Sequence, residues 1–247
     1  MPPLLATLLR LPPEEQAAVV RSLPDGHLRR WAREFGEWAH DGQAAPAGDW
    51  RTWVVMGGRG FGKTRAGAEW VLGEVRAWGE GVESPRAASR HGSESRDVEQ
   101  ARPCRPVGRS RAFRVALVGA TVEDARSIMV EGPSGLLALA RPGEIARWRA
   151  ADRRLEWTNG AVASLFSGRS PQGLRGPEHD IAWCDELGKW RHAQAAWDML
   201  QLGLRRGERP RAVVAVIPQC DTCSQIVKGR PRRNGDVPSR AMCRPDR

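Results

Sequence analysis

The stretch Gly57-Gly58-Arg59-Gly60-Phe61-Gly62-Lys63-Thr64 decides the fold of this chain. It fits the pattern G-x-x-x-x-G-K-[ST] of a phosphate-binding loop. In such a loop the glycines permit a tight turn that points backbone N–H groups at phosphates, the lysine adds a positive charge, and the threonine hydroxyl binds Mg²⁺. The alternative is a glycine-rich surface turn, which accounts less well for Lys-Thr at the required offset. The motif therefore predicts binding of a nucleoside triphosphate with Mg²⁺.

The segments around this loop alternate between strand and helix patterns. Residues 53–56 have the pattern of a short buried strand, and residues 65–72 that of a helix whose N-terminus faces the phosphates. The remaining patterns indicate strands over 113–118, 181–184 and 212–217, helices over 121–129 and 193–204, and a hairpin joining 154–157 to 162–166. The alternation predicts an α/β fold of the P-loop NTPase class, with a mostly parallel central sheet flanked by helices.

Charge is distributed unevenly along the 247 residues, whose formal net charge is +10. The excess of arginine and lysine lies in two segments rich in proline, arginine and serine, and the rest is close to neutral. We expect a helical segment over 1–45, an ATPase domain over 46–218 with a disordered insertion over 79–112, and a disordered, basic, low-complexity tail over 219–247.

Membrane and secretory signals are not visible in the sequence. No apolar run approaches the about 18 residues that a membrane span needs, and the N-terminus lacks a signal-peptide pattern. We therefore expect a cytoplasmic protein with reduced thiols. Cys184 lies in an apolar run, which predicts burial. Cys220 and Cys223 have C-x-x-C spacing, and we consider an incidental pair a better interpretation than half of a zinc site.

A second candidate motif, Asp185-Glu186, follows the apolar run 181–184. Acids at the carboxyl end of a strand beside the phosphate loop suit two roles, with Asp185 linked to Mg²⁺ and Glu186 acting as general base on the attacking water. The alternative is a solvated strand end. Arg59 and Arg175 are candidates to supply positive charge to the transition state, although Arg59 could equally pack or pair with a carboxylate.

Longer stretches resemble the large terminase subunit of tailed phages, above all the type found in prophages and gene transfer agents of α-proteobacteria. The resemblance extends over roughly residues 30–78 and 113–214. It rests on these segments: 50–53, 57–70, 118–119, 129–137, 159–161, 174–177, 182–187, 189–192 and 197–200.

This resemblance implies a DNA-packaging motor. Its ATPase domain hydrolyses ATP to drive double-stranded DNA through the portal into a procapsid in the cytoplasm of a bacterial host cell. The portal protein and the small terminase subunit are the implied partners, and no membrane is involved. Carried over by position, Gly57, Gly62, Lys63 and Thr64 bind the phosphates and Mg²⁺, Arg59 matches the arginine of the family's loop, Asp185 the metal-linked acid and Glu186 the catalytic carboxylate.

Three departures from the family pattern concern the end of the sequence. The segment 215–218 lacks the threonine-rich continuation that couples hydrolysis to movement, the residues after Pro218 look unlike the family, and no nuclease domain is found. We expect a C-terminally truncated or frame-disrupted terminase without nuclease activity. Four functions stay open: an active ATPase, a remnant that binds nucleotide without turnover, another P-loop DNA-dependent ATPase, and a nucleic-acid-binding protein that acts through its basic tail.

Overall fold

The computed structural model describes residues 7–8, 10–24, 26, 34–81 and 111–217. The chain divides into two compact units, Met1–Ala45 and Pro46–Arg247. The expected insertion falls almost wholly on 82–110, and the expected tail and the pair Cys220/Cys223 fall on 218–247, so these features lie outside the described residues and stay predictions.

The described elements follow one another along the chain as predicted in outline. They are α2 (Pro13–Ser22), α4 (Phe35–Trp38), β1 (Thr52–Met56), α5 (Lys63–Gly79), β2 (Arg114–Gly119), α6 (Val122–Asp124), the π-helix η1 (Ala125–Val130), α7 (Leu136–Leu139), β3 (Ile145–Arg149), β4 (Arg154–Trp157), β5 (Val162–Ser167), the 3₁₀ helix η2 (Pro171–Leu174), β6 (Ile181–Cys184), the 3₁₀ helix η3 (Leu187–Lys189), α8 (Ala193–Gly203) and β7 (Arg211–Val216).

Among its described residues, the first unit contains the helices α2 and α4. α2 begins with a proline and carries Glu14 and Glu15 in its first turn, where carboxylates interact favourably with the helix dipole. The spacing of apolar residues in sequence predicts a helix from about His27 to His40, of which residues 27–33 lie outside the described part. Its end differs from this prediction: α4 ends at Trp38 because Ala39 has an extended backbone. No helix in the described part of the chain is long and apolar enough to cross a membrane.

The second unit is built around a seven-stranded sheet, whose strands lie in the order β1-β7-β6-β2-β5-β4-β3. The strands from β1 to β5 in this order pair in parallel, whereas β5, β4 and β3 pair antiparallel. The prediction of a mostly parallel sheet is therefore confirmed. β3 was not expected, because arginines interrupt its apolar pattern and three of its five residues are exposed.

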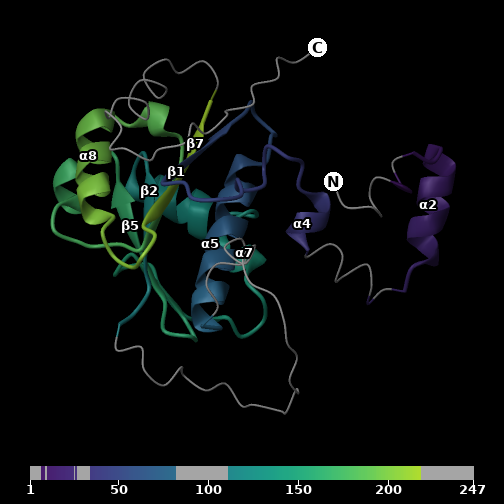
Figure 1. Cartoon of the computed structure of the whole chain (residues 1–247), viewed down its shortest axis with the longest axis horizontal. Coiled ribbons are helices and arrows are strands. Elements are labelled where there is room, and N and C mark those ends of the chain that lie inside the picture. Colours follow the sequence, from purple (N-terminus) through teal and green to yellow (C-terminus); the bar gives the residue numbers. More distant parts are fainter. Residues whose placement is uncertain (1–6, 9, 25, 27–33, 82–110, 218–247) are drawn as a thin grey trace. The chain divides into compact units, whose positions relative to one another are not determined.

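Helices cover both faces of the sheet, with α8 on one face and α5 and α7 on the other (Figure 1). Every residue of β6 and β7 is buried, as expected for central parallel strands. Ala182 and the Cys184 thiol pack in the cluster that contains Trp197 of α8, which confirms the predicted burial of Cys184. On the opposite face, Trp183 packs against Gly67 of α5.

The close approach of α5 to the sheet predicts opposite effects at two glycines of one helix. A Cβ on buried Gly67 would clash with the indole of Trp183, whereas a Cβ on Gly73 meets nothing within 4 Å. We expect Gly67→Ala to lower the free energy of unfolding by about 1–3 kcal/mol through overpacking. Gly73→Ala should raise it by about 0.8 kcal/mol through helix propensity. Urea unfolding of both variants checks this, and a stabilising Gly67→Ala would contradict the packing described.

Beyond β2, Thr121 and Asp124 stand in sequence at the spacing of a helix capping box, and the cap that this spacing predicts is confirmed. The Thr121 side chain accepts a hydrogen bond from the backbone N–H of Asp124 (3.0 Å), and the Asp124 carboxylate accepts one from the backbone N–H of Thr121 (3.1 Å). This is a reciprocal capping box. After one turn the helix widens into the π-helix η1, which the sequence pattern did not indicate.

Candidate active site

The stretch 57–64 connects the end of β1 to the start of α5. Gly60 and Gly62 have φ values of 78° and 81°, a left-handed backbone that favours glycine. At Gly57 a Cβ would clash with the ring of Phe61. The loop is tied to the sheet because the Gly57 N–H donates to the Val216 carbonyl at the end of β7 (3.3 Å). It therefore has a tight, glycine-dependent conformation at the carboxyl edge of the sheet.

Lys63 begins α5 and folds back over this loop. Its ammonium donates to the carbonyl oxygens of Gly57 and Gly58, at 2.7 Å each. Burial lowers the pKa of Lys63, and the charges of Glu186 and Asp185 oppose that shift. A lysine held in this way places a positive charge at the N-terminus of a helix, where anions already bind favourably.

Asp185 extends the parallel sheet by one residue beyond β6. Its backbone N–H donates to the Val118 carbonyl at 2.9 Å, and the residue is only 8% exposed. Burial raises the pKa of Asp185 to about 6, with a smaller contribution from the charge of Glu186. Among the described residues, no hydrogen bond or ion pair reaches the Asp185 carboxylate, which leaves its oxygens available to a ligand.

Glu186 turns the chain out of the sheet. Its φ of 44° and ψ of 58° are left-handed, a conformation that non-glycine residues adopt rarely and at an energetic cost. The Glu186 carboxylate forms an ion pair with Lys189, three residues further along. The hydrogen bond from Lys189 to Glu186 raises the pKa of the Lys189 ammonium.

The Trp190 side chain supports the turn that carries Asp185 and Glu186. Its indole N–H donates to the Asp185 carbonyl at 3.0 Å, and its ring lies so close to Gly168, after β5, that a Cβ there would clash. Leu187 is also fully buried. Side chains that pack in this way hold the backbone of residues 185–190 in one conformation.

Strand order explains how motifs about 120 residues apart in sequence come together. β7 is the only strand between β1 and β6, and all three run parallel, so their carboxyl ends share one edge of the sheet. The Lys63 ammonium consequently interacts electrostatically with both Asp185 and Glu186. Ligands of parallel α/β sheets bind at this edge.

Two further residues of the site were missed by the sequence argument. The Asp124 carboxylate lies near enough to raise the pKa values of both Asp185 and Lys189. Lys189 pairs with Glu186, a contact that its spacing of three residues after Glu186 would have suggested once η3 was known to be helical. In sequence, Asp124 could be interpreted only as a capping residue, which it also is.

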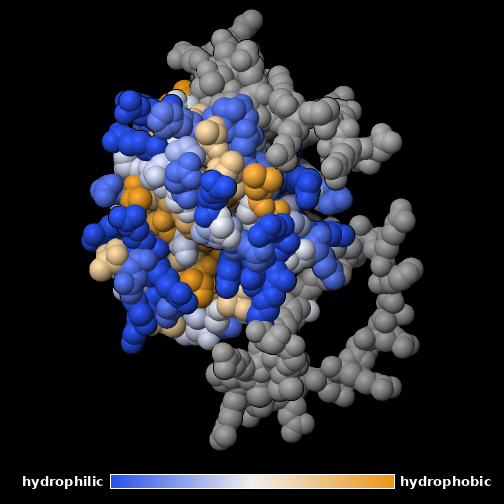
Figure 2. All heavy atoms as spheres, turned by 90° about the vertical axis from the view of Figure 1, so that its left-hand side faces the viewer, coloured by the Kyte–Doolittle hydropathy of each residue, from blue (hydrophilic) through white to orange (hydrophobic). Residues whose placement is uncertain are grey.

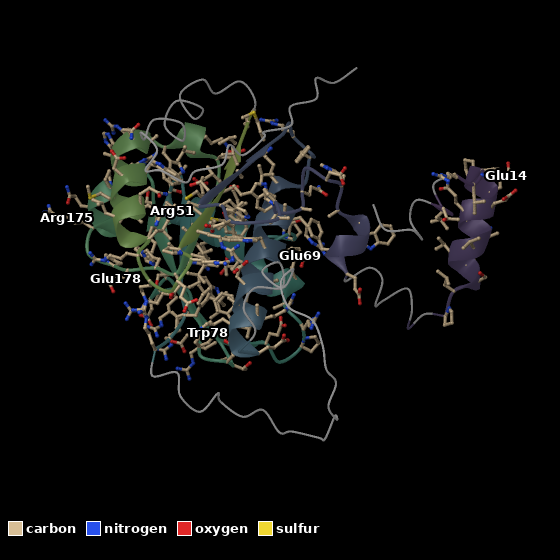
Figure 3. The ribbon with its side chains drawn as sticks, in the orientation of Figure 1. Glu14, Arg51, Glu69, Trp78, Arg175 and Glu178 are labelled. Atoms are coloured by element: carbon tan, nitrogen blue, oxygen red, sulfur yellow. The ribbon has the colours of Figure 1, made fainter. Side chains whose placement is uncertain are left out.

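The two candidate arginines occupy different places. Arg59 lies within the phosphate loop and is exposed. Arg175 follows η2 and points outward from the flank of the sheet that carries α8, on the other side from α5 (Figure 3). That flank is largely covered by hydrophilic side chains with small apolar patches between them (Figure 2). Arg175 is therefore not part of the cluster around Lys63 in this structure.

The raised pKa of Asp185 predicts a pH-dependent gain in stability on its replacement. Aspartate in an unfolded chain has a pKa of about 3.9, so the folded chain binds the Asp185 proton more tightly than the unfolded chain does. Ionisation of Asp185 therefore destabilises the folded chain progressively as the pH rises from about 4 to about 6. Above that range the destabilisation has its full size. We expect Asp185→Asn to raise the free energy of unfolding of the nucleotide-free protein by about 2 kcal/mol at pH 8 and hardly at pH 4. Urea unfolding at both pH values tests this, and an equal gain at both would refute it.

A parallel sheet, a glycine-rich loop that leads into a helix, and acids at the end of a nearby strand define a P-loop nucleotide-binding domain. A family model described as "Terminase large subunit, T4likevirus-type, N-terminal" matches residues 54–219, which is more than half of the chain. The chain therefore belongs to the terminase large subunit family and contains the N-terminal domain of that family.

Comparison with solved structures finds the Thermus phage P74-26 large terminase ATPase domain and a single-residue mutant of that domain. Each is 14% identical to this chain, with a TM-score of 0.46, and the alignment covers 76% of this chain and 68% of the other. No curated protein matches the chain.

Proposed function

We propose that this chain hydrolyses ATP in a magnesium-dependent reaction and that this hydrolysis drives the packaging of double-stranded DNA. The observation that supports this most strongly is the gathering of one ammonium group and two carboxylates at a single sheet edge. There, Lys63 interacts electrostatically with Asp185 and Glu186. The family match supports the same conclusion, because it covers this whole region.

The residues present fit Mg²⁺. Mg²⁺ prefers oxygen ligands, and the hydroxyl of Thr64, at the start of α5, and the carboxylate of Asp185, directly after β6, would provide them. Asp185 is buried without a hydrogen bond to its carboxylate among the described residues, and a cation beside it would offset the burial that raises its pKa. When bound, Mg²⁺ would neutralise phosphate charge and orient the terminal phosphoryl group.

Each protein group has a distinct role in this proposal. The backbone N–H groups of residues 58–62 and the Lys63 ammonium bind the phosphates, with the ammonium exchanging its contacts to the Gly57 and Gly58 carbonyls for phosphate oxygens. The Glu186 carboxylate accepts the proton of the attacking water, which is the task of a general base. Arg59, exposed within the loop, contributes positive charge to the transition state.

The proposed packaging role also implies partners, namely double-stranded DNA, the portal and the small terminase subunit. A terminase large subunit acts on double-stranded DNA, at the portal and with the small subunit, in the cytoplasm of the bacterial host. The family match to residues 54–219 supports this assignment.

Phosphate release from ATP by the purified 247-residue chain tests the proposal, with and without Mg²⁺ and double-stranded DNA. Turnover that disappears on chelation of Mg²⁺ is the expected result. Nucleotide-dependent thermal stabilisation without turnover would instead favour a domain that binds nucleotide but does not hydrolyse it. Absence of both would overturn the proposal.

A further inference from the structure

The ion pair between Glu186 and Lys189 joins a partly buried carboxylate to a surface lysine. The Glu186 side chain is 25% exposed, and that of Lys189 is 63% exposed. The Lys189 backbone N–H donates to the Glu186 carbonyl at 2.8 Å, so η3 closes a single turn that brings the two side chains together.

The backbone on both sides of this pair is held by buried groups. Leu187 is fully buried, and the Trp190 indole donates to the Asp185 carbonyl at 3.0 Å. Glu186 itself has a left-handed backbone conformation, at the point where the chain passes from β6 into η3. With the backbone held in this way, rotation about the side-chain bonds is the main freedom that the Glu186 carboxylate retains.

We propose that Lys189 is a positioning residue, which holds the Glu186 carboxylate in the orientation needed to activate water. The inference rests on the proposed function, in which Glu186 is the general base. Lys63 already supplies an ammonium at the phosphate loop, whereas Lys189 pairs with the acid from the exposed side of the turn. A general base must lie within hydrogen-bonding distance of the water, and small displacements of a reacting group reduce rates strongly.

Variants of Lys189 can show whether the residue acts on the orientation of the Glu186 carboxylate or on nucleotide binding. Lys189→Met keeps the aliphatic stem but removes the ammonium, and we expect kcat to fall about tenfold with KM changed less than about twofold. Lys189→Arg, which can form the same ion pair, should restore kcat to within about threefold of wild type. Affinity for a non-hydrolysable ATP analogue, measured by fluorescence titration, should be the same in all three proteins.

Arg205 provides a matched control. Its side chain is 62% exposed, close to the value for Lys189, and it also pairs with a glutamate, Glu178. Unlike Lys189, it lies beyond α8, where the chain leads into the amino end of β7. Arg205→Met should leave kcat, KM and analogue affinity unchanged. A general effect of removing a surface ion pair would alter both variants alike and would overturn the inference.

A double-mutant cycle distinguishes failure of the inference from failure of the proposed function. If the wild-type chain has no turnover, the proposed function is wrong and the inference falls with it. If the wild-type chain turns over ATP and Glu186→Gln does so at the same rate, Glu186 is not the general base, and the inference is wrong while ATP hydrolysis stands. If Glu186→Gln loses turnover while Lys189→Met does not, the inference alone is wrong. It is also wrong if Lys189→Met raises kcat or weakens analogue binding. When Glu186→Gln and Lys189→Met are combined, the loss in kcat should be no larger than with Glu186→Gln alone.

Discussion

Glu186→Gln is expected to reduce ATP turnover by about 10³-fold while nucleotide binding persists. Glutamine keeps the size of the side chain but cannot accept the proton of the attacking water. In the proposed function the phosphate contacts come from other groups, namely the loop backbone and Lys63, so we expect the binding energy to change little. The expected result is thus a large loss in kcat at nearly constant affinity for a non-hydrolysable analogue.

Steady-state phosphate release and fluorescence titration measure these two quantities. Glu178→Gln is the matched control, since Glu178 is also a partly exposed carboxylate paired with a basic side chain, but it precedes the amino end of β6. A Glu186→Gln protein that turns over ATP at the wild-type rate would exclude Glu186 as the general base. Equal losses in both variants would indicate a non-specific effect on folding.

Lys63→Met should abolish nucleotide-dependent stabilisation. A ligand at one hundred times its dissociation constant stabilises a folded protein by about 2.7 kcal/mol, which corresponds to a rise in Tm of about 5–10 °C for a domain of this size. In the proposed function Lys63 brings a full positive charge to the phosphates, and its ammonium already lies over the loop, 2.7 Å from two backbone carbonyls. Without this charge, the same nucleotide concentration should shift Tm by less than about 2 °C.

Thermal unfolding with and without Mg²⁺ and ATP checks this expectation. Arg147→Met serves as the control, because it removes one positive charge from an exposed position of β3, a strand at the far edge of the sheet from β1. If Lys63→Met keeps the full nucleotide-dependent shift, the phosphate-binding role of Lys63 is wrong. If Arg147→Met loses the shift, the effect depends on net charge rather than on the loop.

Both acids of the candidate site lower the stability of the nucleotide-free protein, each for a different physical reason. Asp185 is a buried carboxylate whose ionisation destabilises the nucleotide-free protein, as its raised pKa indicates. Glu186 has a left-handed backbone, which also costs stability. Such local costs concentrate at functional sites, where the surrounding structure compensates for them. Here the compensation comes from buried Leu187 and Trp190 on the same turn.

Local patterns in the sequence determined much of this protein by themselves. The glycine spacing of residues 57–64 predicts a tight turn, and Gly60 and Gly62 adopt positive φ there. The apolar runs predict the central strands, and Thr121 with Asp124 predicts the helix cap. These features depend on neighbouring residues or on burial alone, so a linear sequence contains the information that defines them.

Other features were decided only by the tertiary structure. Strand order places β7 between β1 and β6 and so brings Lys63 to Asp185, an arrangement that depends on pairing between distant segments. The contact of Lys189 with Glu186 depends on a left-handed residue and a 3₁₀ turn that packing of Trp190 supports. β3 pairs in the sheet despite its exposed arginines because β4 supplies its hydrogen-bonding partner. Periodicity reports which side chains are buried, whereas the identity of the neighbour across the sheet depends on long-range packing that no local pattern encodes.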